Sequence, residues 1–235
     1  MPTVRLFIPC LVDNVYPEMG FAMLKILKHF GYTVEYNSEQ TCCGQPAFNA
    51  GHLKEAKAVA NHCLSVFAED DSPIISPSGS CTAMIRNYYK ELLDDESVEV
   101  EKLCANIYEF SEFMIKNNHH IELQKIIEAD AGIRIHNSCH SARELGLKTE
   151  IYSCMNQPCD TEEPVCCGFG GLFSVKFPDI AESMGKARMD HLLQGDKKTI
   201  ISNDPGCIMH LRQIITHDKL DYKILHLCEY LAEKI

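Results

Sequence analysis

The sequence predicts an α/β protein made of two pseudo-repeated lobes, each a small parallel sheet with helices on its faces. Two observations lead to this prediction. A Cys-Cys-Gly triplet occurs twice, at 42–44 and 166–168, and each triplet has one lone cysteine before it and one after it. Around both triplets, short apolar runs alternate with amphipathic stretches. Such alternation of strands and helices is typical of parallel sheets, because parallel neighbours need a crossover connection.

The spacing of the cysteines indicates an internal duplication. The first lone cysteines are 129 residues apart (139 − 10), the triplets 124 (166 − 42) and the last cysteines 126 (207 − 81). We therefore expect a first cysteine-rich lobe over 1–120 and a second over 121–235, with the joint in the polar segment 117–131. The eight cysteines of this frame are Cys10, Cys42, Cys43, Cys81, Cys139, Cys166, Cys167 and Cys207.

Each expected element of the first lobe has a local signal. A short apolar run over 4–9 ends in proline and predicts a buried strand. Apolar residues at helical spacing predict helices over 17–30 and 53–67, and β-branched residues predict strands over 32–36 and 73–76.

The second lobe repeats this order. Strands are expected over 133–136 and 199–202, each followed by a lone cysteine, and a helix over 179–193 follows the second triplet. Leu103-Cys104 and Leu227-Cys228 are 124 residues apart, and each pair is expected to open an amphipathic helix. We therefore expect the duplication to extend past the last cysteine of each frame.

The framework cysteines fall at or after the carboxyl ends of the expected strands, where ligands gather in open α/β sheets. Gly44, Gly168, Gly170 and Gly171 allow tight turns and a close approach of the backbone to a bulky group. Four converging thiolates suit either an iron–sulfur cluster or tetrahedral zinc. Zinc ribbons usually use Cys-x-x-Cys pairs, so adjacent cysteines with two distant ones favour iron–sulfur, with zinc in one or both sites as the alternative.

Composition narrows the class of protein. The 235 residues are 46% hydrophobic, which is enough for a sizeable core. Thirteen cysteines without a visible secretory signal argue against a disulfide framework and for a cytoplasmic metal or redox protein. No apolar run approaches the roughly 20 residues that span a bilayer, so direct membrane insertion is not expected. A net charge of −11 argues against nucleic-acid binding.

The other cysteines and the polar residues near the second triplet have simpler interpretations. Cys63, Cys104 and Cys228 lie on apolar helix faces and are expected to pack in the core. Cys154 and Cys159 flank a polar loop and are expected to be exposed thiols, with a spare ligand as the alternative. A further group of residues would tune a cluster or hold an anion, although for each one alone a solvated or core position is favoured: His136, His140, Arg143, Lys176, Lys186 and Arg188.

The strings Cys-Cys-Gly-Gln-Pro-x-x-Asn-x-Gly at 42–51 and Cys-Cys-Gly-Phe-Gly-Gly-x-Phe at 166–173 are specific. With them, nearly the whole chain resembles the cysteine-rich CCG-domain family, and in particular its short two-unit lactate-utilisation members. The resemblance implies an iron–sulfur electron-transfer subunit with two [4Fe–4S] clusters on the eight framework cysteines. It also implies a complex that oxidises L-lactate to pyruvate with two other subunits, one an iron–sulfur protein and one a small partner.

One departure from the family pattern matters. In the CCG-domain subunit of heterodisulfide reductase each unit ends in Cys-x-x-Cys, whereas Ser78 and Asp204 stand here at the first of those positions. The resemblance then implies four ligands per lobe and an ordinary cubane cluster. Asp204 precedes a proline and is expected to be a solvated turn residue, with oxygen ligation as the alternative.

No Gly-x-Gly-x-x-Gly follows an expected strand and opens a helix, so a self-contained nicotinamide or flavin enzyme is not expected. We expect an oxidoreductase subunit that is not active alone. Two alternatives remain: a subunit of the thiol–disulfide or heterodisulfide reductase type, and a zinc-stabilised scaffold without a redox role.

Overall fold

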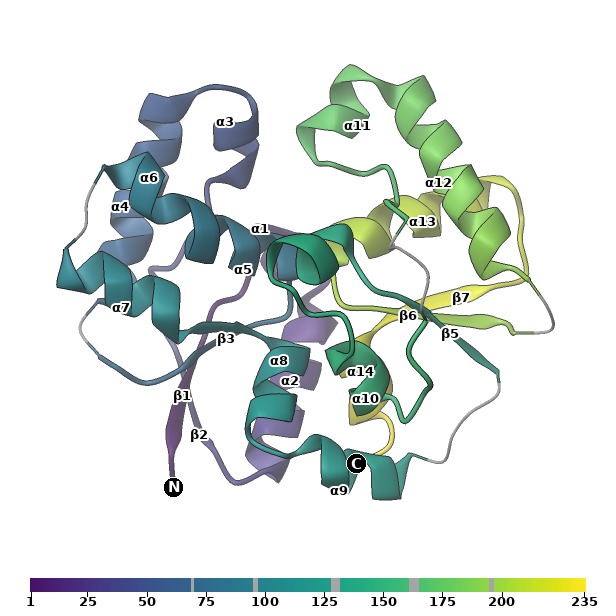
Figure 1. Cartoon of the computed structure of the whole chain (residues 1–235), viewed down its shortest axis with the longest axis horizontal. Coiled ribbons are helices and arrows are strands. Elements are labelled where there is room, and N and C mark those ends of the chain that lie inside the picture. The colour runs from purple at the N-terminus through teal and green to yellow at the C-terminus, as the bar shows by residue number, and fades with distance from the viewer. Residues whose placement is uncertain (69, 95–96, 128–131, 161–164, 195–196) are drawn as a thin grey trace. The chain divides into compact units, whose positions relative to one another are not determined.

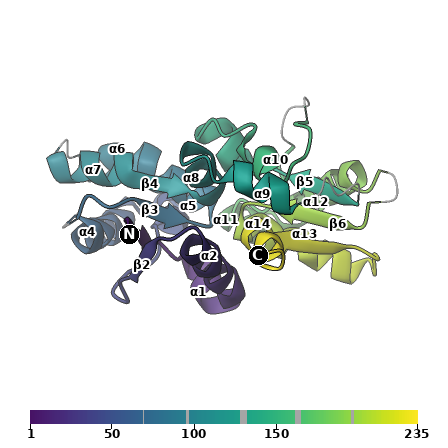
Figure 2. The ribbon, with the colours of Figure 1, turned by 90° about the horizontal axis from the view of Figure 1, so that it is seen from below.

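The structure, a computed structural model, describes residues 1–68, 70–94, 97–127, 132–160, 165–194 and 197–235 (Figure 1). It forms two compact units, Met1–Phe110 and Ser111–Ile235. Each unit has one parallel sheet with helices packed beside it, so the predicted α/β fold class is confirmed (Figure 2). The sequence placed the lobe boundary after residue 120, and the compact units divide after Phe110. Among the described helices, none has both the length and the apolar character needed to cross a membrane.

The first unit contains a parallel sheet of order β2-β1-β3-β4. Its strands are β1 (Thr3–Leu6), β2 (Thr33–Tyr36), β3 (Ile74–Ser76) and β4 (Ile107–Glu109). The central strand β3 is buried along its whole length, as its Ile-Ile-Ser sequence requires, whereas β2 is largely exposed at the edge. The parallel register places the carboxyl ends of β1 and β3 side by side, because Leu6 is paired with Ile75.

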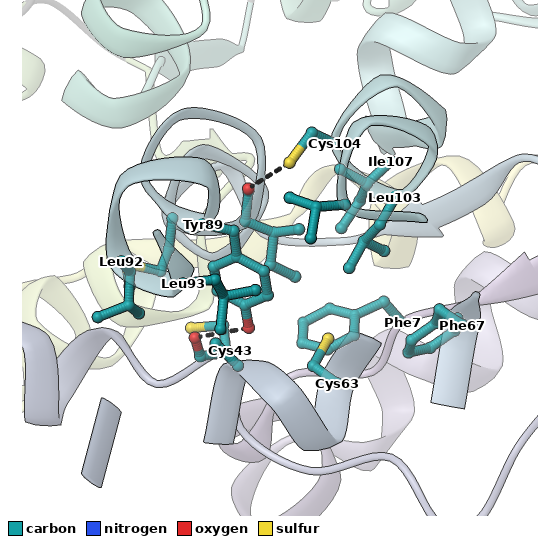
Figure 3. Close-up of a cluster of buried hydrophobic side chains, with 14 of the residues drawn as sticks. Phe7, Cys43, Cys63, Phe67, Tyr89, Leu92, Leu93, Leu103, Cys104 and Ile107 are labelled. Atoms are coloured by element: carbon teal, nitrogen blue, oxygen red, sulfur yellow. Dashed lines mark hydrogen bonds between the residues drawn. The ribbon is translucent and has the colours of Figure 1, made fainter. Parts of the chain in front are cut away.

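Helices connect these strands and close the core of the first unit. They are α1 (Cys10–Val15), α2 (Pro17–His29), α3 (Gln45–Asn49), α4 (Leu53–Phe67), α5 (Gly79–Ala83), the π-helical turn Met84–Tyr88, α6 (Tyr89–Leu93) and α7 (Val98–Asn106). A buried apolar cluster contains Phe7, Cys63 and Tyr89 together with residues of α7 (Figure 3). The Tyr89 hydroxyl donates a 2.9 Å hydrogen bond to the backbone oxygen of Cys43, which ties the first triplet to this core.

The second unit contains a parallel sheet of order β5-β6-β7. Its strands are β5 (Ile133–His136), β6 (Thr199–Ser202) and β7 (Lys223–His226). Its helices are α9 (His120–Ile126), the π-helical turn His140–Glu144, α10 (Glu150–Cys154), α11 (Leu172–Lys176), α12 (Pro178–Leu192), α13 (Pro205–His217) and α14 (Leu227–Ala232), and α8 (Phe110–Lys116) begins at the unit boundary.

The strand registers show which elements are equivalent. Ser76 of β3 is paired with Glu109, and Ser202 of β6 is paired with His226. Since each serine lies five residues before the last framework cysteine, β5, β6 and β7 correspond to β1, β3 and β4. Within the described residues the second sheet has no counterpart of β2.

The predicted equivalence of Leu103-Cys104 and Leu227-Cys228 is wrong, although β4 and β7 do carry the duplication past the last framework cysteines. Cys104 lies near the end of α7, before β4, whereas Cys228 is the second residue of α14, after β7. The two Leu-Cys pairs therefore occupy different places in the fold, and their equal spacing is a coincidence of loop and helix lengths.

Candidate metal centre

The first site gathers four cysteines at the carboxyl edge of the first sheet. Cys10 opens α1 just after β1, the Cys42-Cys43 pair lies in the loop after β2, and Cys81 lies in α5 after β3. The Sγ atoms of Cys10 and Cys42 are 3.8 Å apart, and those of Cys43 and Cys81 are 3.3 Å apart. The thiols of Cys42 and Cys43 also interact, so the four sulfurs form one continuous group.

The second site repeats this arrangement. The Sγ atoms of Cys139 and Cys166 are 3.9 Å apart, and those of Cys167 and Cys207 are 2.9 Å apart. The thiols of Cys166 and Cys167 interact in turn. The structure thus brings together the four framework cysteines of each lobe within that lobe.

The glycine of each triplet lies in a tight turn and faces a helix further along the chain, α4 for Gly44 and α12 for Gly168. The backbone N–H groups of Gly44 and Gly168 donate to Cys42 Sγ and Cys166 Sγ, each over 3.4 Å. Both glycines have positive φ, 82° and 86° respectively. A Cβ on Gly168 would lie 2.5 Å from the backbone oxygen of Ala181, so no side chain fits there, whereas the corresponding contact of Gly44 would be 3.4 Å.

The thiols of each site share their protons unequally. Hydrogen bonds from the Cys10 and Cys43 thiols lower the pKa of Cys42 to about 3, and the bond that Cys10 donates to Cys42 raises the pKa of Cys10. In the second site, hydrogen bonds from Cys139 and Cys167 likewise lower the pKa of Cys166 to about 2. Each site therefore holds a thiolate surrounded by thiols, and a bound cation would displace the remaining protons.

This donor set fits a metal ion or an iron–sulfur cluster. Eight sulfurs in two groups of four are soft ligands, and the glycine N–H groups supply hydrogen bonds to sulfur. The clustered cysteines thus indicate metal or iron–sulfur binding. The inner thiols are well shielded from solvent, since Cys43 and Cys167 are each only 2% exposed, whereas Cys10 lies at the exposed rim of the first site.

The last cysteine of each site is held by a capped helix. Ser78 caps α5 and accepts a 3.3 Å hydrogen bond from the Cys81 N–H. Asp204 caps α13 through Oδ1, which accepts from Gly206 N at 3.0 Å and from Cys207 N at 3.4 Å. Asp204 is 4% exposed, so the expectation of a solvated turn residue is wrong: the carboxylate is buried because it satisfies the free N–H groups of the helix.

His136 and Arg188 form a buried pair beside the second site. Arg188 Nε donates a 3.0 Å hydrogen bond to His136 Nδ1, and the side chains are 5% and 0% exposed respectively. A ring nitrogen of His136 lies within 4.8 Å of both the Cys167 and the Cys207 sulfur. Burial, together with the charge of Arg188, lowers the pKa of His136 to about 3, so the imidazole is neutral.

The other polar residues that the sequence suggested near this site differ in their placement. His140 Nδ1 lies 3.8 Å from Cys139 Sγ. Lys186 is half-exposed and pairs with Glu182 over 2.6 Å on the same helix. Arg143 and Lys176 are exposed.

The remaining cysteines mostly follow the prediction. Cys63, Cys104 and Cys228 are buried, at 1%, 5% and 0% exposure, which confirms that they pack in the core. Cys159 is exposed, as expected. Cys154 is fully buried, so its expected exposure is wrong: it ends α10, and its thiol points to the Ser111 backbone oxygen at 3.9 Å.

Comparison with known proteins agrees with this geometry. The model of the CCG family, described as a cysteine-rich domain, matches residues 4–86 and 133–212. The chain is 38% identical over 237 residues to lactate utilization protein A of Halalkalibacterium halodurans, covering 97% of this chain and 96% of that protein. It is 35% identical to lactate utilization protein A of an Exiguobacterium species, covering 100% and 99%, and 35% identical to lactate utilization protein A 2 of Bacillus cereus strain Q1, covering 98% of each.

Proposed function

The chain belongs to the CCG cysteine-rich domain family, and from that premise we propose that each of its two CCG units holds an iron–sulfur cluster and that the protein passes electrons during the oxidation of L-lactate to pyruvate. One observation carries the proposal: two groups of four cysteine sulfurs recur at equivalent places in two α/β units. The ligands would be Cys10, Cys42, Cys43 and Cys81 in the first unit and Cys139, Cys166, Cys167 and Cys207 in the second.

The lactate role is supported by relatives that align along nearly their whole length. They are named lactate utilization protein A, and neither they nor this chain has a long unmatched segment in these alignments. A name that ends in a letter implies a system with further components. We propose two partner subunits, one an iron–sulfur protein and one a small protein.

An iron–sulfur cluster supplies transfer of single electrons. The chain supplies the ligand thiolates, shields the inner ones from water and donates N–H groups of Gly44 and Gly168 to cysteine sulfurs. Oxidation of lactate to pyruvate releases two electrons and two protons. No described element carries a dinucleotide fingerprint, so a partner has to take these from the substrate before single electrons reach this chain.

Metal analysis tests the first half of the proposal. The full chain, purified without oxygen, should contain iron and acid-labile sulfide, and Cys43→Ser should lose part of both. Cys159→Ser is the matched control, because Cys159 is exposed and lies outside both groups. Stoichiometric zinc without sulfide would replace the proposal with a zinc-stabilised scaffold.

Reconstitution tests the second half. Lactate should reduce the purified protein only when the partner subunits are present, and deletion of the gene should abolish growth on L-lactate in a strain without a second lactate dehydrogenase. Reduction of the isolated protein by lactate would contradict the proposed division of labour. Cleavage of a thiol disulfide by the reduced protein would favour a heterodisulfide reductase type of subunit instead.

A further inference from the structure

The buried side chains beside the two cysteine groups are chemically different. Phe7 directly follows the Leu6–Ile75 pair of β1 and β3, and its N–H donates to the Ile75 backbone oxygen. His136 directly follows the equivalent Ile135–Ile201 pair of β5 and β6. Phe7 and His136 both lie three residues before the first cysteine of their unit. The first unit thus has an aromatic hydrocarbon ring where the second has an imidazole.

The helix that each triplet glycine faces, α4 or α12, differs between the units in the same way. Gly44 faces the backbone oxygen of Ala56, and Gly168 faces that of Ala181. Seven residues further along these helices lie Cys63 and Arg188 respectively. The apolar pair Phe7 and Cys63, which belongs to the buried cluster of the first unit (Figure 3), is therefore replaced by the hydrogen-bonded pair His136 and Arg188 in the second.

We propose that His136 donates a hydrogen bond from Nε2–H to a sulfur of the group bound at the second site, that Arg188 positions it, and that the second site consequently has a more positive reduction potential than the first. This inference rests on the proposed iron–sulfur function. It assigns to His136 the role of a donor and not that of a metal ligand.

The donor role follows from the hydrogen bond of Arg188. A guanidinium group has only donors, so the 3.0 Å bond from Arg188 Nε makes His136 Nδ1 the acceptor. A neutral imidazole then carries its proton on Nε2. This nitrogen is buried and has no hydrogen-bond partner among the described residues. A buried N–H without a partner is costly, and a sulfur of the bound group would satisfy it.

The difference in potential follows from electrostatics. Reduction adds negative charge to a cluster, and hydrogen bonds to its sulfurs stabilise that charge. Arg188 adds a buried positive charge near Cys167 and Cys207, but the buried carboxylate of Asp204 opposes it at Cys207, so the expected difference rests on the hydrogen bond from His136. Phe7 and Cys63 supply no comparable charge or imidazole donor to the first site. An electron that reaches the protein should therefore reduce the cluster of the second unit in preference to that of the first.

Redox titration of each site by itself tests the inference. The full chain with Cys42→Ser and Cys43→Ser retains only the second site, and the chain with Cys166→Ser and Cys167→Ser retains only the first. Both are prepared without oxygen and analysed for iron and sulfide, and midpoint potentials are measured by EPR. The second site should have the more positive midpoint potential.

Variants of the second site identify the residues responsible. His136→Phe combined with Arg188→Cys reproduces the Phe7 and Cys63 pair of the first unit. It removes the buried Arg188 charge together with its partner His136, so the variant should fold. Its midpoint potential should shift towards that of the first site with iron retained. His136→Gln keeps an N–H donor and should shift the potential less. His217→Phe is the control, because His217 is exposed at the end of α13.

The outcomes separate the inference from the proposed function. An unchanged potential with full iron content overturns the inference and leaves the proposed function standing. Loss of iron from folded His136→Gln protein makes His136 a ligand and likewise overturns the donor role. Absence of iron and sulfide in both backgrounds overturns the proposed function, and the inference with it.

Discussion

Ser78 and Asp204 cap equivalent helices, and each accepts a hydrogen bond from the N–H of the last cysteine of its site. Both residues occupy the position of a further cysteine in heterodisulfide reductase. In both units the side-chain oxygen at this position caps a helix. A cap of this kind also fixes the position of the cysteine that follows, because the bonded N–H belongs to that cysteine.

Removal of the Asp204 cap should lower stability without loss of metal. We expect Asp204→Ala to lower the free energy of unfolding by about 1 kcal/mol, with Asp204→Asn nearly neutral because asparagine caps as well as aspartate. Urea unfolding followed by circular dichroism measures this, and Ser78→Ala is the matched change in the first unit. Iron loss in Asp204→Asn at unchanged stability would instead make the carboxylate a ligand.

The two sites should be lost independently. Cys43→Ser should remove the signal of the first site alone and Cys167→Ser that of the second alone, because every sulfur contact described joins cysteines of one unit. Iron analysis with EPR reports the two losses. Disappearance of both signals from either single variant, in protein that remains folded, would contradict this independence.

The core cysteines should matter for stability only. Cys63→Ala and Cys228→Ala each remove one buried sulfur and should each lower the unfolding free energy by about 1 kcal/mol with metal content unchanged. Thermal unfolding and iron analysis are compared with those of Cys159→Ala, whose side chain is exposed and whose loss should cost nothing measurable. A loss of iron in the Cys228 variant would count against its place in the core.

The two triplet glycines should differ in their tolerance of a side chain. Gly44→Ala should cost about 1–2 kcal/mol from its positive φ alone, since its Cβ meets the nearest backbone oxygen at 3.4 Å. Gly168→Ala should cost more, because its Cβ would lie 2.5 Å from the Ala181 oxygen and the loop has to move. Chemical denaturation of both variants checks the order, and equal losses would show that the loop of the second unit adapts.

Thiol reactivity of the metal-free protein should follow protonation more than exposure. With a pKa of about 3, Cys42 is a thiolate at pH 6, and so is Cys166 with a pKa of about 2. Burial and Asp160 raise the pKa of the Cys159 thiol above its ordinary value, so this thiol is protonated at pH 6. Iodoacetamide should label Cys42 and Cys166 first, as read by peptide mass spectrometry. Faster labelling of Cys159 would contradict the proton sharing.

Much of the fold could be predicted because the repeated signals are local. The Ile-Ile-Ser run before each last cysteine forms a buried central strand in both units, and the glycine of each triplet turns the chain as expected. These features depend on residue type at fixed spacing, and spacing survives in a duplicated sequence.

The errors come from features that only tertiary packing decides. Cys154 lies next to a polar stretch, yet α10 buries it. The Leu-Cys pairs match in spacing but not in fold, because the chain from Cys81 to β4 forms α5, a π-helical turn, α6 and α7, whereas the chain from Cys207 to β7 forms only the rest of α13. His136 meets Arg188 across 52 positions of sequence, and periodicity gives no signal for such a pair.

The closure of each cysteine group within one unit also bears on biosynthesis. The four framework cysteines of the first unit are all in the chain once Cys81 is added, whereas the second group is complete only at Cys207, 126 residues later (207 − 81). At about 5–20 residues per second this takes roughly 6–25 s, and domains fold N-terminal first. The first four thiols can therefore come together before the second set is complete, so the order of synthesis favours ligand groups that close within one unit.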